Sequence, residues 1–256
     1  CRGISVRTPQ RHELERLADP LPISLDEPNA LVLDQAEWRV NQGDWQPGEE
    51  ILRLDNLARA AMGIPAKQGH IAQPWTEADD PTPLGRLELR FAIDCEVAVR
   101  TPQLVVEQPQ DIELTLDGAP VPVADTGWWV DEAIRTVLLP DLTPGRHELR
   151  LSIRYHRRTN VEWCYLLGDF GVRVRGRRAT LVAPVRELTF GDWGPQGLPF
   201  YTGNVTYHAS IDLGPVAFAP YEIALGDLAA GGHRLDLTVF GDRLNTFGTL
   251  HRVATG

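Results

Sequence analysis

The feature that most constrains this chain is an alternation of apolar and polar residues in three segments. In residues 87–93, 112–116 and 149–155 every second residue is apolar, and most residues between are charged or polar. Such segments form strands with one buried and one solvated face, which is typical of antiparallel sheets. Strands recur about every ten residues with Pro or Gly between them, and the turn Asp117-Gly118 follows the second segment. The spacing predicts an all-β chain built as a sandwich or jelly roll.

Two further elements are predicted nearer the N-terminus. Residues 30–40 have the composition of a strand that ends at a turn over residues 41–44. One short helix is predicted over residues 51–61, where apolar residues recur at helical spacing after two glutamates and before Gly63. The helix is the exception in a chain of strands.

A repeat indicates how the strands are grouped. Residues 141–151 match residues 227–237 without a gap, an offset of 86 residues (227 − 141). Each copy has a glycine-bearing turn, then a strand with alternating leucines, and a short strand precedes each (135–139 and 221–225). A hairpin repeated at this separation predicts two related antiparallel sandwiches in tandem. Two unrelated hairpins with common turn chemistry are the alternative that the sequence leaves open.

The predicted organisation has three parts. Residues 1–28 form a charged, proline-rich lead-in, residues 29–185 the first β-sandwich, and residues 186–256 a second, jelly-roll-like β-sandwich. The last part is short for a complete sandwich, so either a loop is absent near residues 213–215 or the two units share strands. The chain does not begin with Met and its start is too charged for a signal peptide, so we expect a fragment or processed piece.

Composition excludes several classes of partner. Twenty-five Lys and Arg residues against thirty-five Asp and Glu residues give a net charge of −10, which disfavours binding to nucleic-acid phosphates. The apolar runs are far shorter than the roughly 20 residues that span a bilayer, so we expect no membrane partner. Three cysteines without a CxxC pair predict neither a disulfide framework nor a metal site.

Candidate catalytic residues are few. The chain has no Gly-x-Ser-x-Gly elbow, and Cys95 and Cys164 lie in apolar segments where a cysteine is usually a small buried hydrophobe. Glycoside hydrolysis needs two carboxylates, and Asp169 and Asp192 lie in glycine-rich, aromatic segments. Acidic residues beside glycines more often end strands or cap turns. The two aspartates are therefore weak candidates, and we expect no catalytic residue in this chain.

The pattern of histidines favours structural roles over a metal-binding or catalytic site. Seven of them are dispersed, without an HExxH motif. His147 and His233 occupy the same position in the two repeat copies, just after the turn, which favours a structural role. No cofactor is predicted, and a structural calcium is the alternative that an acidic sandwich leaves open.

Sugar binding is the chemistry with the clearest physical basis. Sugars stack their apolar C–H faces on aromatic rings and need planar polar partners for their hydroxyl groups. Several aromatic side chains lie beside turns, and residues 198–207 add aromatic and amide groups, although core packing is the common use of such residues in sandwiches. Asn204 also begins an Asn-Val-Thr glycosylation sequon. The candidate carbohydrate contacts from these segments are Trp128, Trp129, Trp193, Tyr201 and Asn204.

Some of these segments resemble a known group of proteins. Residues 198–207 (LPFYTGNVTY) are similar to the opening strand of galactose-binding-like, jelly-roll domains of bacterial glycoside hydrolases related to α-L-rhamnosidases and to the β-galactosidase clan. Residues 220–223 and 232–248 look like closing strands of the same domain and add Arg243 and Asn245 as candidate sugar contacts. Upstream segments, including residues 162–172, are similar to the C-terminal region of large bacterial glycosyl hydrolases.

The resemblance implies a limited function. In that family the hydrolytic residues lie in a separate upstream domain, so it implies a non-catalytic accessory region that supports the catalytic domain of the same polypeptide and binds carbohydrate. It implies a bacterial origin and leaves open whether the location is cytoplasmic or secreted. The hairpin missing near Leu213 departs from the family pattern. A free-standing lectin-like or interaction module is one alternative, and a β-sandwich polysaccharide hydrolase or lyase is another.

Overall fold

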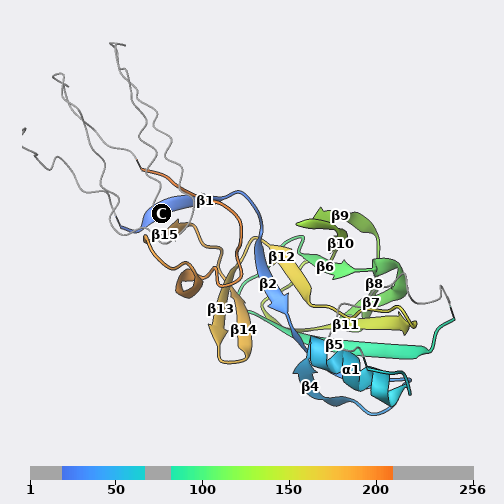
Figure 1. Cartoon of the computed structure of the whole chain (residues 1–256). Helices are drawn as coiled ribbons and strands as arrows, with labels where there is room; N and C mark the ends of the chain where they lie inside the picture. The colour runs from blue at the N-terminus through green and yellow to red at the C-terminus, as the bar shows by residue number, and fades with distance from the viewer. Residues whose placement is uncertain (1–18, 67–81, 210–256) are drawn as a thin grey trace, which may run out of the picture.

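A computed structural model describes residues 19–66 and 82–209 of the chain (Figure 1). These residues form several antiparallel sheets with one α-helix, which confirms the all-β prediction. No helix in this part of the chain is long and apolar enough to cross a membrane.

The helix is α1 (Ile51–Ala61), and the 3-10 turns are η2 (Pro109–Asp111) and η3 (Gly194–Gln196). The strands are, in chain order, β1 (Leu21–Leu25), β2 (Asn29–Leu33), β3 (Gln35–Val40), β4 (Gln46–Glu50), β5 (Gly85–Cys95), β6 (Gln103–Glu107), β7 (Ile112–Leu116), β8 (Ala119–Val121), β9 (Asp125–Trp129), β10 (Asp131–Leu138), β11 (Gly145–Tyr155), β12 (Cys164–Gly168), β13 (Gly171–Arg175), β14 (Arg178–Val182), β15 (Glu187–Leu188) and β16 (Val205–Tyr207).

Two sheets pack against each other around the main core. The five-stranded sheet has the order β2-β12-β6-β10-β9. The eight-stranded sheet has the order β13-β14-β5-β11-β7-β8, with β3 and β4 attached beside β5. Leu104 and Leu166 of the first sheet and Phe91 and Leu151 of the second belong to one buried cluster. Burial of apolar side chains between facing sheets is what stabilises a sandwich.

The long strands β5 and β11 form the centre of the eight-stranded sheet. They pair without a break from Gly85 opposite Tyr155 to Cys95 opposite Gly145. This pairing confirms the strands predicted over residues 87–93 and 149–155. On the other side of β11, β7 turns into β8 through Asp117 and Gly118, whose φ angles of 51° and 79° suit a two-residue hairpin.

The single strand predicted over residues 30–40 is wrong in one respect. The segment forms two strands in different sheets, because β2 pairs with β12 and β3 pairs with β5. The buried positions change phase between them, from Leu31 and Leu33 to Ala36 and Trp38. A strand buries every second residue on one face, so a change of phase requires the chain to leave the first sheet.

Helix α1 confirms the predicted helix. Ile51, Leu54 and Ala58 are fully buried against the core, and the first-turn N–H groups of Leu52 and Arg53 donate to the carboxylate of the N-cap residue Glu50. After the helix, Gly63 adopts a φ of 70°, which glycine reaches without steric cost.

A small third sheet joins two segments that the sequence analysis separates. Strand β1 lies in the predicted lead-in, and it pairs with both β15 and β16. Leu188, Leu198 and Tyr201 form a buried cluster beside it, with Ile23 and Leu25 of β1 packed against them. Residues 213–215 and the second repeat copy over 227–237 lie outside the described residues, so the division into lead-in and two sandwiches stays a prediction.

Candidate functional site

The candidate site lies on the polar, outer face of the eight-stranded sheet. Alternation along β5 and β11 places Leu89 and Leu151 in the core and leaves Arg90 and Arg150 for the opposite face. Arg90 is in register with Glu37 of β3 on one side and with Arg150 of β11 on the other. Charged side chains from three adjacent strands therefore lie side by side on this face.

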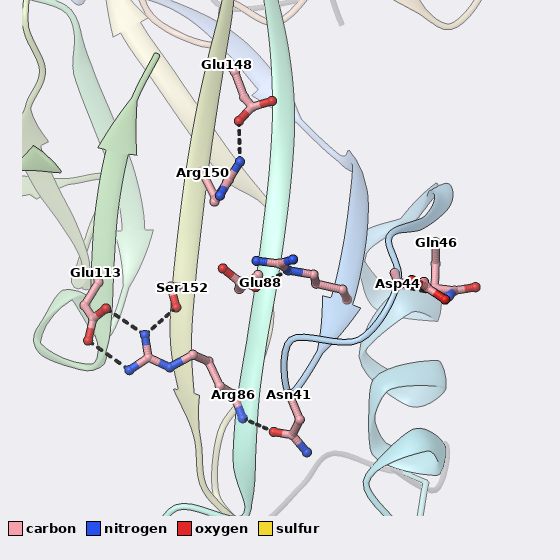
Figure 2. A network of polar contacts seen from close by, with 10 residues as sticks. Asn41, Asp44, Gln46, Arg86, Glu88, Glu113, Glu148, Arg150 and Ser152 are labelled. Atoms are coloured by element: carbon pink, nitrogen blue, oxygen red, sulfur yellow. Dashed lines mark hydrogen bonds and ion pairs between the residues drawn. The ribbon is translucent and has the colours of Figure 1, made fainter. Parts of the chain in front are cut away.

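One end of this face is a closed polar network (Figure 2). The Arg86 guanidinium donates to both carboxylate oxygens of Glu113 over 2.7 and 3.0 Å, and to the Ser152 hydroxyl over 2.9 Å. The Arg86 backbone N–H donates to Oδ1 of Asn41 over 2.8 Å. The hydrogen bonds from Arg86 lower the pKa of the Glu113 carboxyl. These polar groups are hydrogen-bonded to one another, so this end of the face links β5, β7 and β11.

In the middle of the face, three arginine side chains lie against the ring of Trp45. The guanidinium carbons of Arg39, Arg90 and Arg150 lie 4.8, 4.3 and 5.3 Å from the centroid of the Trp45 ring. Trp45 belongs to the turn between β3 and β4 and is half-buried. Guanidinium groups at this distance are attracted to the π electrons of an indole ring. The turn is thereby held against the sheet.

A groove of about 620 Å³ opens beside these arginines. Strand β3 pairs with β5 at residues 87–90, and β14 pairs with β5 at residues 94 and 95. Strand β11 occupies the other edge of β5 throughout, so β3 and β14 share one edge. On that edge, residues 91–93 have no strand partner in the described chain. Ala92 lies at this interruption with its small side chain exposed. The two diverging strands form the walls of the groove.

Most charges that line the groove are already paired. The Arg90 guanidinium bonds to Glu37 and lies 3.6 Å from a carboxylate oxygen of Glu148. The Arg146 guanidinium lies 3.9 Å from a carboxylate oxygen of Asp94. Arg177 and Arg178, at the β13–β14 turn, also line the groove. The groove thus presents planar cations and carboxylates around a small apolar floor.

His147 lines one end of the groove and has a polar partner at each ring nitrogen. Its Nε2 donates to the Thr143 carbonyl over 2.7 Å, and its Nδ1 lies 2.6 Å from Oδ2 of Asp117. Both nitrogens can donate only if the ring is an imidazolium. Burial lowers the pKa of His147, but the Thr143 carbonyl and the Asp117 carboxylate outweigh it and raise the pKa overall. This structural use of His147 agrees with the prediction.

The two adjacent tryptophans predicted to bind sugar lie on the other sheet, in β9. Trp128 is 54% exposed. Trp129 packs against Tyr165 with ring centroids 5.1 Å apart, over a small buried cluster that includes Val105. Successive residues of a strand face opposite ways, so the two rings do not form one platform. Of this pair, Trp128 is the ring with a largely free surface.

The other described aromatic candidates gather at the small sheet. The Trp193 indole N–H donates to the Tyr207 hydroxyl over 2.8 Å, and the rings of Trp193 and Tyr201 lie 6.4 Å apart. The Tyr201 hydroxyl lies 2.8 Å from Oε2 of Glu27 and 2.7 Å from the Asn204 carbonyl oxygen. Burial and the adjacent Glu27 raise the pKa of Tyr201 to about 12. The structure packs Trp193 against Tyr201, and it brings the backbone of the exposed Asn204 to the Tyr201 hydroxyl.

The two candidate aspartates have structural partners. Oδ2 of Asp169 lies 2.5 Å from the Arg186 guanidinium in an exposed ion pair. Oδ1 of Asp192 accepts a hydrogen bond from the Gly194 N–H over 2.9 Å, and the Asp192 carbonyl accepts another from Gln196, so Asp192 caps the turn η3. These contacts match the common use of acidic residues beside glycines.

The remaining predicted groups fall into three cases. Cys95 and Cys164 are buried, and burial raises the pKa of their thiols to about 11 and about 12. The described part of the chain holds no cluster of three His, Cys, Asp or Glu side chains suited to a metal ion. Arg243 and Asn245 lie outside the described residues.

Sequence reasoning missed Arg177 and Arg178, which line the groove, and Trp45, which contacts the groove residue Arg90. Trp45, Arg177 and Arg178 come from two hairpin turns that are more than 120 residues apart in the chain, and only strand pairing on β5 brings these turns to one face. The available signal was the Gly176-Arg177-Arg178 turn between alternating segments, together with a tryptophan in the turn after residue 40. A turn marks exposure but does not indicate which other turn lies beside it.

Comparisons with known proteins add little to this geometry. No family model matches the chain, and no curated protein matches it. Two structures of a GH2 β-galacturonidase from Eisenbergiella tayi, bound to galacturonate and to glycerol, are similar to it in part. The galacturonate-bound structure is 10% identical, with a TM-score of 0.30, and the match covers 62% of this chain and 29% of the enzyme. The glycerol-bound structure is 11% identical, with a TM-score of 0.32, and the match covers 64% of this chain and 30% of the enzyme. A likeness of this size carries neither a family nor an activity to this chain.

Proposed function

We propose that this chain is a non-catalytic accessory region of a glycoside hydrolase and that its groove beside Trp45 binds carbohydrate. The supporting observation is the combination of shape and chemistry on the outer face of the eight-stranded sheet. The volume of about 620 Å³ lies within the range of roughly 300–1,000 Å³ that is usual for small-ligand sites. Planar guanidinium and carboxylate groups line it, and such groups pair well with the hydroxyl groups of sugars.

The aromatic partner in this proposal is Trp45. Its ring contacts Arg90, and Arg90 lines the groove, so the indole supports a side chain that a bound ligand would meet. The turn-flanking aromatic residues of the sequence point to other rings, and of those Trp128 is the more exposed alternative. The two positions belong to different sheets, so single substitutions separate them.

The supporting role toward a catalytic domain rests on the sequence resemblance. Among the described residues 19–40, at the end of the lead-in and the start of the first predicted sandwich, no large apolar side chain is exposed. The groove is the feature on which the proposal depends. A free-standing lectin-like module would use the same groove, and the presence or absence of a catalytic domain in the same polypeptide distinguishes the two cases.

A second candidate is a β-sandwich polysaccharide hydrolase or lyase. Glu37 and Glu148 both contact Arg90 within the groove, so two carboxylates face one space. Retaining and inverting hydrolases each require such a pair. Release of reducing ends from a polysaccharide by the purified chain, abolished in Glu148→Gln, would support this candidate against the accessory role.

The test is glycan binding by the intact chain and two variants. Trp45→Ala should weaken binding at least about fivefold, which corresponds to ~1 kcal/mol of lost aromatic contact, while Trp128→Ala should leave it unchanged. The reverse result would move the site to the five-stranded sheet. An array of neutral and acidic glycans that gives no signal with the wild-type chain would remove the binding function.

A further inference from the structure

The groove is not electrically uniform along its length. At the β3 side Arg90 is bonded to Glu37, and toward β11 Arg146 lies near Asp94. At the β14 side Arg177 and Arg178 are exposed, and within the described residues neither has a carboxylate partner. One wall of the groove therefore carries uncompensated positive charge.

The β13–β14 hairpin concentrates this charge. Residues 173–178 contain four arginines, and Arg175 lies directly opposite Arg178 in the strand register. Of the four, Arg173 is bonded to Glu96. Like charges directly opposite each other on a hairpin destabilise it, and an anion bound at this turn would relieve the repulsion. The chain as a whole carries a net charge of −10, so this hairpin is a positively charged segment in a negatively charged protein.

We infer that the groove accommodates a glycan that bears carboxylate groups, with Arg177 and Arg178 as the residues that recognise the carboxylate; this inference rests on the proposed carbohydrate binding. A guanidinium presents two parallel N–H donors that match the two oxygens of a carboxylate. The exposed Ala92 leaves room for a sugar ring between this wall and the wall that contains Glu37. The glutamates on that side accept hydrogen bonds from sugar hydroxyls.

The arginines would attract any anionic sugar, and the negative charge can come from carboxylate groups or from sulfate groups. The carboxylate is the favoured source, because its planar pair of oxygens matches the planar pair of N–H donors of one guanidinium. The probes are an alginate hexamer, its methyl-esterified form, and a heparin hexasaccharide of the same length. Methyl esterification removes the charge and leaves the sugar backbone unchanged, so it isolates the contribution of the carboxylate.

The variants are Arg177→Gln with Arg178→Gln, and a control with the same change of charge, Arg53→Gln with Arg157→Gln. All four side chains are exposed, so the fold should be retained. Arg157 follows the end of β11 opposite to the groove, and Arg53 lies on α1. The measurement is calorimetric affinity at low and at physiological salt, with the intact chain.

The expected result is that the alginate hexamer binds at least tenfold more tightly than its ester, and that the Arg177/Arg178 variant loses this preference while the control keeps it. Equal binding of the ester, or an unaffected Arg177/Arg178 variant, would overturn the inference and leave carbohydrate binding in place. Tighter binding of heparin would overturn it in favour of a sulfated ligand. An equal loss in the control would show a non-specific charge effect and also overturn it. Absence of binding to any glycan, neutral ones included, would remove the proposed function as well.

Discussion

The Tyr155 hydroxyl donates a hydrogen bond to Oδ1 of Asp55 over 2.5 Å, and both side chains are buried. The pair joins the last residue of β11 to the middle of α1. Arg59, one turn further along the helix, lies beside the same carboxylate and donates to the Thr159 carbonyl over 2.9 Å. A buried charge is tolerated only with such partners. This network fixes the helix at the end of the sandwich that is remote from the groove.

Tyr155→Phe should lower the free energy of unfolding by about 1–3 kcal/mol, because it removes a hydrogen bond from a buried carboxylate and leaves the packing nearly unchanged. Urea unfolding of the full chain measures the effect. Tyr165→Phe is the matched control, since the Tyr165 hydroxyl has no hydrogen-bond partner within the described residues and the ring is half-buried. An equal loss of stability in both variants would contradict a specific role for the Asp55 contact.

Glu50→Ala should cost about 0.5–2 kcal/mol of stability, because the carboxylate accepts hydrogen bonds from the first-turn N–H groups of Leu52 and Arg53. Burial raises the pKa of Glu50, but the Trp163 indole and these N–H groups outweigh it and lower the pKa overall. The stabilisation is therefore present above the unfolded pKa and is lost as the pH falls through the lowered folded value.

The measurement for Glu50 is the difference in unfolding free energy between wild type and variant as a function of pH. The difference should be constant near neutrality and shrink in acid. Glu49→Ala removes the same charge one residue earlier and serves as control. The Glu49 carboxylate accepts from the Glu50 N–H and lies 3.7 Å from the Arg53 guanidinium, but it accepts no first-turn N–H of the helix. A difference that persists unchanged in strong acid would argue against capping.

Asp117→Asn should make the stability of the chain less dependent on pH above neutrality. The pKa of His147 is raised in the folded state, so the stabilisation from its imidazolium is complete below the unfolded pKa of about 6.5 and is lost as the pH rises through the folded value. The stability advantage of wild type over Asp117→Asn should therefore be largest near pH 5–6 and decline above pH 7.

Asparagine tolerates the left-handed backbone of this turn, where residue 117 has a φ of 51°, so the variant tests the charge and not the turn. Titration of the His147 ring by NMR gives an independent reading. An advantage that grows above pH 7 would show that the ring is neutral in the folded state.

Ala92→Tyr should abolish glycan binding without loss of stability. Residue 92 is exposed on the outer face of β5, so a large ring there fills the groove without entering the core. Tyrosine is favoured in strands, and unfolding free energy should stay within about 0.5 kcal/mol of wild type. Affinity and thermal unfolding are measured on the same samples. Retained affinity would mean that ligand binds elsewhere, for example at Trp128.

The sequence by itself determined the strands, the helix and their buried faces. Alternating leucines in β5 and β11 can satisfy their burial only in a sheet with one covered face, and the spacing of Ile51, Leu54 and Ala58 gives an apolar stripe only on a helix. These are local properties of residues two to four positions apart. The Asp117-Gly118 turn is local in the same sense, because two left-handed residues in succession require such side chains.

Only the tertiary structure determined where the groove lies and which residues line it. Trp45 and Arg178 lie near one face only because β3 and β14 pair with different halves of the same edge of β5. The choice of partner strand depends on packing between sheets, and no local pattern records it. The same holds for the aromatic candidates: the sequence shows that Trp128 and Trp193 lie beside turns, but burial against other sheets determines that Trp193 is packed and that Trp128 remains exposed.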